Sequence, residues 1–211
     1  MQVNSQKRIY TYLALGDSYT IGESIDVRRS WPVQLVNHVN KANYGFQIGD
    51  PKIIAKTGWT TQELKAAITE EMPSKNYDFV SLLIGVNNQY RGYPFEEYSK
   101  EFRSLLDIAV AHAGGNSDKV IVLSIPDYGF TPHGKPRREA ITMDIDRYNV
   151  VNRKISDEYG IKYYDITQIS RDGLKHTDLV AKDKLHPSSK QYTLWVDKIL
   201  RDEGFLRLFD N

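Results

Sequence analysis

The chain contains 211 residues, a length that suits one domain with a sizeable buried core. Its formal net charge is +1 and it has no long run of Lys or Arg, so we expect no nucleic-acid partner. Cysteine is absent, which excludes disulfides, thiolate metal sites and a cysteine nucleophile.

No stretch approaches the roughly 20 apolar residues of a membrane-spanning helix, and the polar start Met1 to Arg8 lacks a secretory apolar segment. We therefore expect a soluble protein with no membrane span. It is expected to be cytoplasmic by default, or secreted or periplasmic if a signal peptide has been removed. Without a linker or an internal repeat, the sequence predicts a single domain over 1–211 with its core at about 9–205.

Short β-branched or aliphatic runs alternate with amphipathic helix patterns along the chain. The runs at 79–84 and 120–123 are apolar on both faces, which is typical of central strands covered by helices on each side. This alternation predicts an α/β fold, a three-layer α/β/α sandwich that is flavodoxin-like with a five-stranded parallel sheet. The predicted strands are 10–15, 52–55, 78–84, 119–125 and 161–165.

Helix starts are marked by caps and by apolar spacing. Thr60 with Glu63 has the spacing of a capping box, as has Ser188 three residues before a glutamine. Ser30 before Trp31-Pro32 indicates a further start. The predicted helices begin after Trp59, Pro94 and Pro187, and others run from Ser30 through Val39 and over about 137–159, while 131–136 is predicted to be a loop.

The tetrapeptide Gly16-Asp17-Ser18-Tyr19 follows an apolar run at 12–15. A serine at the end of a buried strand points into the crevice where open α/β sheets bind ligands. Gly-Asp-Ser is also ordinary turn chemistry, and a serine hydroxyl is a poor nucleophile until a neighbouring base takes its proton. Ser18 is therefore a candidate nucleophile if the chain also supplies a base.

His186 is the histidine with a distinctive partner pattern. Asp183 precedes it by three residues, a separation that can bring a carboxylate within hydrogen-bond reach of the imidazole. An aspartate that merely caps the following helix is the alternative for the isolated motif, and Ser18 in the same chain favours a Ser-His-Asp triad. A histidine base predicts that activity falls on acidification. The other histidines, in predicted helices or in polar loops, are His38, His112, His133 and His176.

Acyl transfer also needs donors aimed at the developing oxyanion. Gly58 lies between a predicted strand and a capped helix, where a glycine lets a backbone N–H approach the substrate. Asn87 follows the strand at 78–84, and its amide can donate into the same crevice. Gly and Asn are common in such turns, so the prediction of an oxyanion hole depends on their occurring together with Ser18 and His186.

These blocks, in this order, resemble the SGNH (GDSL-like) hydrolases over nearly the whole chain. The resemblance implies a carboxylic ester hydrolase in which Ser18 is the nucleophile and His186 and Asp183 complete the triad. It further implies an oxyanion hole made by the amides of Ser18 and Gly58 and by the Asn87 side chain, with no cofactor and no metal. Asn88 stands where the family usually has aspartate, and we expect this to alter turn support rather than to remove catalysis.

The substrate is expected to be a small-molecule ester, with a small acyl group or a carbohydrate acetyl group as the favoured target. The alternatives within the same family are a lysophospholipase and a thioesterase. Arg91 and Arg138 are candidates for binding an anionic group, although solvated arginines are the default. The residues predicted to contact substrate are Asp17, Trp59, Tyr90 and Tyr128.

Two other classes of protein, a metallophosphatase and a non-catalytic binding module, are alternatives to the esterase. A metallophosphatase would use Asp17, Asp183 and His186 as ligands and would lose turnover with EDTA. A flavodoxin-like binding module would keep the scaffold without turnover, and fluorophosphonate would not label it. Position 20 is Thr, so the G-x-S-x-G elbow of the α/β-hydrolases is missing, and no third glycine completes a dinucleotide fingerprint.

Overall fold

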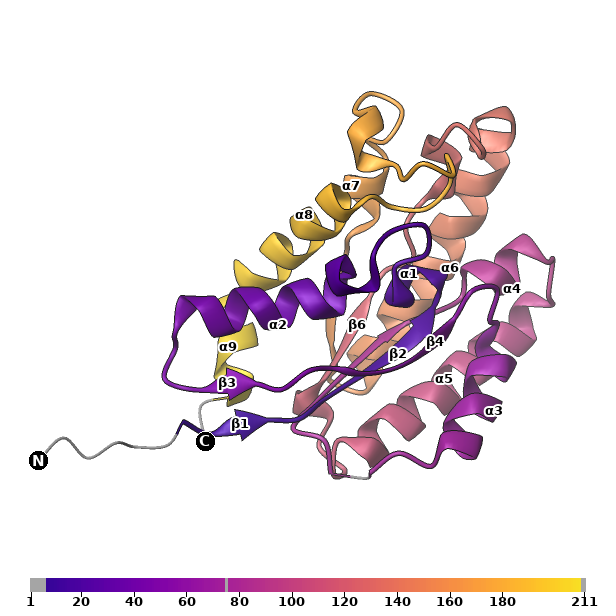
Figure 1. Cartoon of the computed structure of the whole chain (residues 1–211). Helices are drawn as coiled ribbons and strands as arrows, with labels where there is room; N and C mark the ends of the chain where they lie inside the picture. The colour runs from indigo at the N-terminus through magenta and orange to yellow at the C-terminus, as the bar shows by residue number, and fades with distance from the viewer. Residues whose placement is uncertain (1–6, 75, 210–211) are drawn as a thin grey trace, which may run out of the picture.

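A computed structural model of the chain describes residues 7–74 and 76–209. Its centre is a five-stranded parallel sheet with the order β4-β2-β5-β6-β7, the strand order of flavodoxin-like folds (Figure 1). The predicted parallel five-stranded sheet is therefore confirmed. Its strands are β2 (Tyr12–Asp17), β4 (Lys52–Lys56), β5 (Phe79–Leu83), β6 (Val120–Leu123) and β7 (Lys162–Tyr164).

Helices connect the strands and cover the sheet. The α-helices are α1 (Ser18–Ile21), α2 (Trp31–Ala42), α3 (Thr61–Glu71), α4 (Val86–Tyr90), α5 (Phe95–His112), α6 (Arg138–Glu158), α7 (Thr167–Ser170), α8 (Ser189–Leu200) and α9 (Glu203–Leu206). Short 3-10 helices are η1 (Val27–Arg29), η2 (Ser117–Lys119), η3 (Tyr128–Phe130), η4 (Lys135–Arg137), η5 (Thr177–Leu179) and η6 (Arg207–Phe209).

The helices form two outer layers. In Figure 1, α2, α8 and α9 lie on one face of the sheet, and α3, α5 and α6 lie on the other. Within the layers, α2 packs against α8, and α5 packs against both α3 and α6. Every residue of β5 and β6 is buried, as expected for central strands covered on both faces. The predicted α/β/α sandwich is confirmed.

The predicted strand at 10–15 is divided in the structure. β1 (Ile9–Tyr10) pairs in parallel with β3 (Gln47–Ile48) in a separate two-stranded sheet, whereas β2 begins at Tyr12. Between them, the backbone N–H and the hydroxyl of Thr11 both donate to Asp78 Oδ2, each at 2.9 Å. The Thr11 N–H thus donates to a side chain, which interrupts the predicted strand. β3 was not predicted because a strand of two residues is too short to show a periodic pattern in the sequence.

Two predicted caps are formed and one helix starts without its expected hydrogen bond. The Thr60 hydroxyl accepts the N–H of Glu63, whose carboxylate accepts the N–H of Thr60 at 2.8 Å, so the capping box of α3 is complete. Ser188 caps α8 by accepting the N–H of Gln191. Ser30 begins α2 without a side-chain cap, and Pro32 in the first turn removes one donor that a cap would serve.

Three parallel strands end side by side, and this edge collects the residues of interest. Gly16 and Asp17 at the end of β2 are in register with Lys56 at the end of β4 and with Leu83 at the end of β5. The segments that follow these strands therefore emerge as neighbours at the carboxyl edge of the sheet, where open α/β sheets bind ligands.

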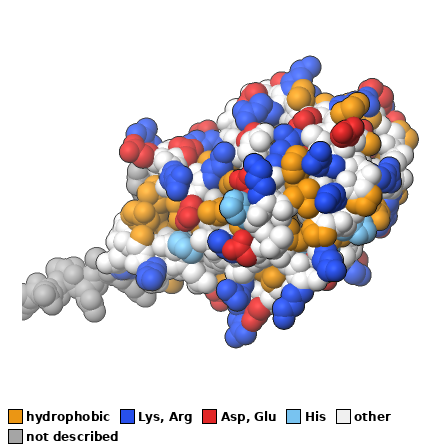
Figure 2. Space-filling view, turned by 90° about the horizontal axis from the view of Figure 1, so that it is seen from above, with side chains coloured by type: hydrophobic (Ala, Val, Ile, Leu, Met, Phe, Trp, Pro, Cys, Tyr) orange, Lys and Arg blue, Asp and Glu red, His pale blue; other side chains and the backbone are white. Residues whose placement is uncertain are grey.

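Figure 2 shows Lys and Arg side chains spread over one face of the molecule, interspersed with hydrophobic, Asp and Glu side chains. None of the helices formed by residues 7–74 and 76–209 is long and apolar enough to cross a membrane.

Candidate functional site

Ser18 sits where β2 turns directly into α1. Asp17 is the N-cap, and its carboxylate accepts the N–H of Tyr19 at 3.0 Å, so the chain reverses immediately at the serine. Ser18 is buried with only 4% of its surface exposed, and it lines a pocket of about 190 Å³. The end of a central strand thus fixes the hydroxyl at the edge of the sheet.

The pocket brings together the segments that follow several strands and the C-terminal loop. Ser18 and His186, far apart in the sequence, line the same cavity. Its lining residues are Ser18, Tyr19, Thr57, Gly58, Val86, Asn87, Tyr90, Tyr128, His133, Leu185 and His186. A serine hydroxyl, an imidazole, an amide side chain and a loop glycine therefore face one small space.

His186 is oriented by Asp183. Oδ2 of Asp183 lies 2.5 Å from Nδ1 of His186, and it also accepts the Ser24 hydroxyl at 2.6 Å. Oδ1 accepts the backbone N–H groups of Leu185 and His186, each at 3.0 Å. Because Ser188 rather than Asp183 caps α8, the alternative of a plain helix cap is not what the structure contains.

The Asp183 carboxylate is held in its charged form. Partial burial alone would raise its pKa, but hydrogen bonds from Ser24, from His186 and from two backbone N–H groups outweigh that effect and lower the pKa to about 2. The carboxylate is therefore ionised at neutral pH and can stabilise a positive charge on the imidazole.

Gly58 and Asn87 come from the loops after β4 and β5. Gly58 has φ of +85°, a conformation that favours glycine, and its carbonyl accepts the Arg91 guanidinium at 2.5 Å. Asn87 donates from Nδ2 to the carbonyl of Trp59 at 2.9 Å. An amide group carries two N–H donors, so one fixes the side chain and the second is left for the pocket.

Asn88 supports the loop that carries Gly58. It is fully buried, accepts the N–H of Thr61 at 3.1 Å and donates to the Thr61 hydroxyl at 2.7 Å. That hydroxyl in turn donates to Glu101. An asparagine fits this series of hydrogen bonds because its amide N–H donates to the Thr61 oxygen, which an ionised carboxylate could not do. This is a physical reason for asparagine at a position where the family usually has aspartate.

Two residues predicted to contact substrate do not line the pocket. Asp17 is fully buried, because its side chain turns inward to cap α1. Burial raises its pKa to about 7, against the lowering effect of the hydrogen bond from the Tyr19 N–H. Trp59 packs its ring against the core, and its carbonyl holds Asn87. Tyr90 and Tyr128 do line the pocket, with ring centroids 6.0 Å apart.

Sequence reasoning missed two residues near the site. His133 lies in the predicted loop and lines the pocket, and its backbone N–H donates to the carbonyl of Lys184 at 3.1 Å. Ser24, which donates to Asp183, has φ of +66° in the turn after α1. Neither contact has a sequence signal, because each joins loops that are distant along the chain.

The metallophosphatase reading is not supported by the residues. Across the described ranges 7–74 and 76–209, no three His, Asp or Glu side chains are grouped so that they could hold a metal ion. Asp17 is buried and caps α1, and it is not a member of the pair formed by Asp183 and His186.

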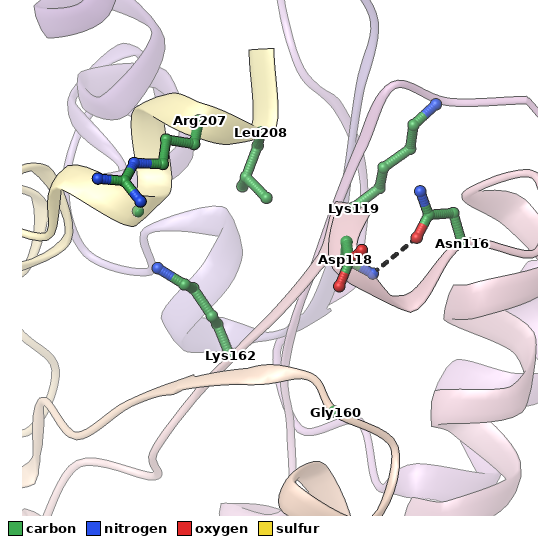
Figure 3. A pocket seen from close by; sticks show the side chains of 8 residues that line it. Asn116, Asp118, Lys119, Gly160, Lys162, Arg207 and Leu208 are labelled. Carbon is green, nitrogen blue, oxygen red and sulfur yellow. Dashed lines mark hydrogen bonds between the residues drawn. The ribbon is translucent and has the colours of Figure 1, made fainter. Parts of the chain in front are cut away.

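A larger cavity of about 510 Å³ lies elsewhere, and neither a serine nor a histidine is among the described residues that line it. Its lining includes Asn116 and Lys119 before β6, Lys162 at the start of β7, and Arg207 near the C-terminus (Figure 3). These segments belong to the amino ends of the strands, opposite the edge that carries Ser18. Lys162 forms an ion pair with Asp202 at 2.6 Å. Because this cavity contains neither Ser18 nor His186, it is not the candidate ester site.

The sequence is similar to a known family of hydrolases. The model of the GDSL-like lipase/acylhydrolase family matches residues 14–194. An acetylxylan esterase from Geobacillus stearothermophilus is 28% identical over 161 residues, which cover 71% of this chain and 69% of that protein.

Solved structures share the fold at lower identity. A variant of an acetyl xylan esterase from Geobacillus stearothermophilus matches with a TM-score of 0.71 and 23% identity, over 94% of this chain and 96% of that one. The psychrotrophic esterase EstA from a Pseudoalteromonas species matches with a TM-score of 0.64 and 19% identity, over 96% of this chain and all of that one. The chain therefore belongs to the GDSL-like lipase/acylhydrolase family and is a carboxylic ester hydrolase.

Proposed function

We propose that this enzyme removes acetyl or other small acyl groups from carbohydrate esters through a Ser18-His186-Asp183 triad. The observation that carries the proposal is the shared pocket, in which Ser18 and His186 face one space while Asp183 holds Nδ1 of the imidazole at 2.5 Å. With Nδ1 engaged, Nε2 is the nitrogen free to act as a base.

In the first half of the reaction, His186 takes the proton of the Ser18 hydroxyl as its oxygen attacks the ester carbonyl. The C–O bond to the alcohol then breaks, and the imidazolium gives its proton to the leaving oxygen. An acyl group remains on Ser18. Asp183 stays ionised through both transfers because its pKa is lowered to about 2.

In the second half, a water molecule takes the place of the alcohol. His186 removes a proton from the water, the resulting hydroxide adds to the acyl carbonyl, and Ser18 leaves with the proton returned to it. At each addition the carbonyl oxygen becomes an anion. The backbone N–H groups of Ser18 and Gly58 and the second N–H of Asn87 are the proposed donors to it.

The size of the pocket supports a small acyl group. Its volume of about 190 Å³ falls below the roughly 300–1,000 Å³ of sites that enclose drug-sized ligands. A long acyl chain, as in a lysophospholipid, would extend out of this space. The similarity to an acetylxylan esterase supports an acetylated sugar as the substrate class.

The proposal is tested with a substrate panel on the wild type and on Ser18→Ala. We expect the wild type to prefer p-nitrophenyl acetate over longer p-nitrophenyl esters and to release acetate from acetylated xylo-oligosaccharides. Ser18→Ala is expected to lose activity by a factor of about a thousand or more while remaining folded. Increasing activity with acyl length, without sugar deacetylation, would contradict the proposed substrate class.

A further inference from the structure

A second cavity adjoins the pocket at Ser18. This cavity has a volume of about 120 Å³ and shares three lining residues with the pocket, namely Tyr90, Tyr128 and His133. Its far wall includes Arg137 in η4. A substrate whose carbonyl is held at Ser18 can therefore reach past the two tyrosines to a positively charged side chain.

Arg137 is the arginine among the residues that line this second cavity. Within residues 7–74 and 76–209, its guanidinium forms no hydrogen bond or ion pair. Arg91 is engaged by Glu63 and by the Gly58 carbonyl, and Arg138 lies over the Phe130 ring at 5.5 Å. Of the two arginines that the sequence had suggested for an anion, Arg91 is thus engaged, and neither of them lines this second cavity.

Tyr128 is linked through Gln89 to an acidic side chain. Tyr128 donates its hydroxyl to Gln89 at 2.9 Å, and Gln89 donates from Nε2 to Asp144 at 3.0 Å. The Asp144 carboxylate is therefore bound through Gln89 and does not pair with Arg137. These contacts also fix the Tyr128 ring, which lines both cavities.

The position of this cavity indicates which half of an ester it receives. His133 is hydrogen-bonded through its backbone N–H to Lys184, two residues before His186. The wall containing His133 therefore lies on the side of His186. Since His186 must hand its proton to the leaving oxygen, the alcohol half of the ester lies on this side.

We propose that the enzyme prefers esters whose alcohol half carries a carboxylate, and that Arg137 binds this carboxylate. This inference rests on the proposed function, and the substrate class it names is an acylated sugar acid. A planar guanidinium offers two parallel N–H donors to a carboxylate, a match that a neutral alcohol lacks. Tyr90, which is 60% exposed, lines both the Ser18 pocket and the cavity that contains Arg137.

The test compares a matched pair of acetyl esters, 4-acetoxybenzoate and its neutral amide 4-acetoxybenzamide. We expect Arg137→Gln to reduce the ratio of kcat/KM for the anionic over the neutral ester by about tenfold, mainly through KM. Arg137→Lys keeps the charge and is expected to retain part of the preference. Added salt is expected to lower the ratio for the wild type, because Arg137 is exposed.

Arg138→Gln is the matched control, since it removes the same charge from the adjacent position and should leave the ratio unchanged. An equal effect of Arg137→Gln on both esters, or an equal shift of the ratio in Arg138→Gln, would overturn the carboxylate site alone. Hydrolysis of neither ester in a Ser18-dependent manner would overturn the proposed function and this inference with it.

Discussion

Oδ2 of Asp183 lies 2.5 Å from Nδ1 of His186, in a pair whose carboxylate is also held by the Ser24 hydroxyl and by two backbone N–H groups. These contacts commit Nδ1 to Asp183, so that Nε2 is the nitrogen available to the pocket. They also keep the pKa of Asp183 near 2, far below the pH at which a histidine base works.

Asp183→Asn is expected to lower kcat by about a hundredfold or more, because an amide can hold the wrong imidazole tautomer and cannot stabilise the imidazolium. The KM for p-nitrophenyl acetate should change little. Ser24→Ala is the graded control, since it removes one of several donors to the carboxylate and should cost far less. An Asp183→Asn variant within a few-fold of the wild type would exclude Asp183 from the triad.

Asn87 and Asn88 are adjacent in sequence, but substituting them is expected to have different effects, on catalysis and on stability respectively. Asn87→Ala removes a proposed oxyanion donor and should lower kcat by about a hundredfold with a small effect on KM. Asn88→Ala breaks two hydrogen bonds to Thr61 in a fully buried site and should lower the free energy of unfolding by about 1–3 kcal/mol. Steady-state kinetics and urea unfolding of both variants separate the two roles, and the opposite pattern would contradict them.

Gly134 holds the loop that carries His133 against the pocket. A Cβ at this position would lie 1.9 Å from the Tyr128 carbonyl oxygen, so the loop would have to move. We expect Gly134→Ala to lose about 1–3 kcal/mol of unfolding free energy together with a part of the activity. Gly49→Ala is the control, because the nearest atom would be 3.6 Å away and the site is remote. Equal stability of the two variants would show that the loop adapts freely.

Asp17 makes a prediction about stability and pH. Burial raises its pKa in the folded protein to about 7, above its usual value of 3.8. Between these values the folded chain holds a proton that the unfolded chain has lost, so this group's contribution to stability falls as the pH rises and is fully unfavourable above pH 7.

Asp17→Asn keeps the acceptor for the Tyr19 N–H and removes the titration. Relative to the wild type, the variant should gain about 2.5 kcal/mol of unfolding free energy between pH 5 and pH 8. The measurement is urea unfolding of both proteins at the two pH values. A difference that stays constant with pH would show that the carboxyl of Asp17 does not titrate in this range.

Much of the fold follows from local patterns in the sequence. The run at 79–83 is apolar at nearly every position and forms a strand buried on both faces, and the Thr60–Glu63 capping box begins α3 at the predicted residue. The division of the first strand was not predictable, since it depends on Asp78, a tertiary partner of Thr11.

The site shows the same limit. The positions of Ser18, Gly58 and Asn87 follow from the ends of parallel strands, which any topology of this class brings to one edge. The direction of a side chain does not follow from these patterns. The Asp17 side chain is buried although it directly precedes Ser18. Trp59 contributes its backbone carbonyl, which accepts a hydrogen bond from Asn87, and its ring does not line the pocket. His133 reaches the pocket through loop packing, which has no period in the sequence.

The most direct test of the account is intact-mass analysis after treatment with a fluorophosphonate. The wild type is expected to gain one adduct that maps to Ser18 and to lose esterase activity in parallel, because the reagent reacts with a serine activated by a histidine base. Folded Ser18→Ala should gain none. Full activity in the labelled wild type, or equal labelling of the Ser18→Ala variant, would contradict the claim that Ser18 is the nucleophile.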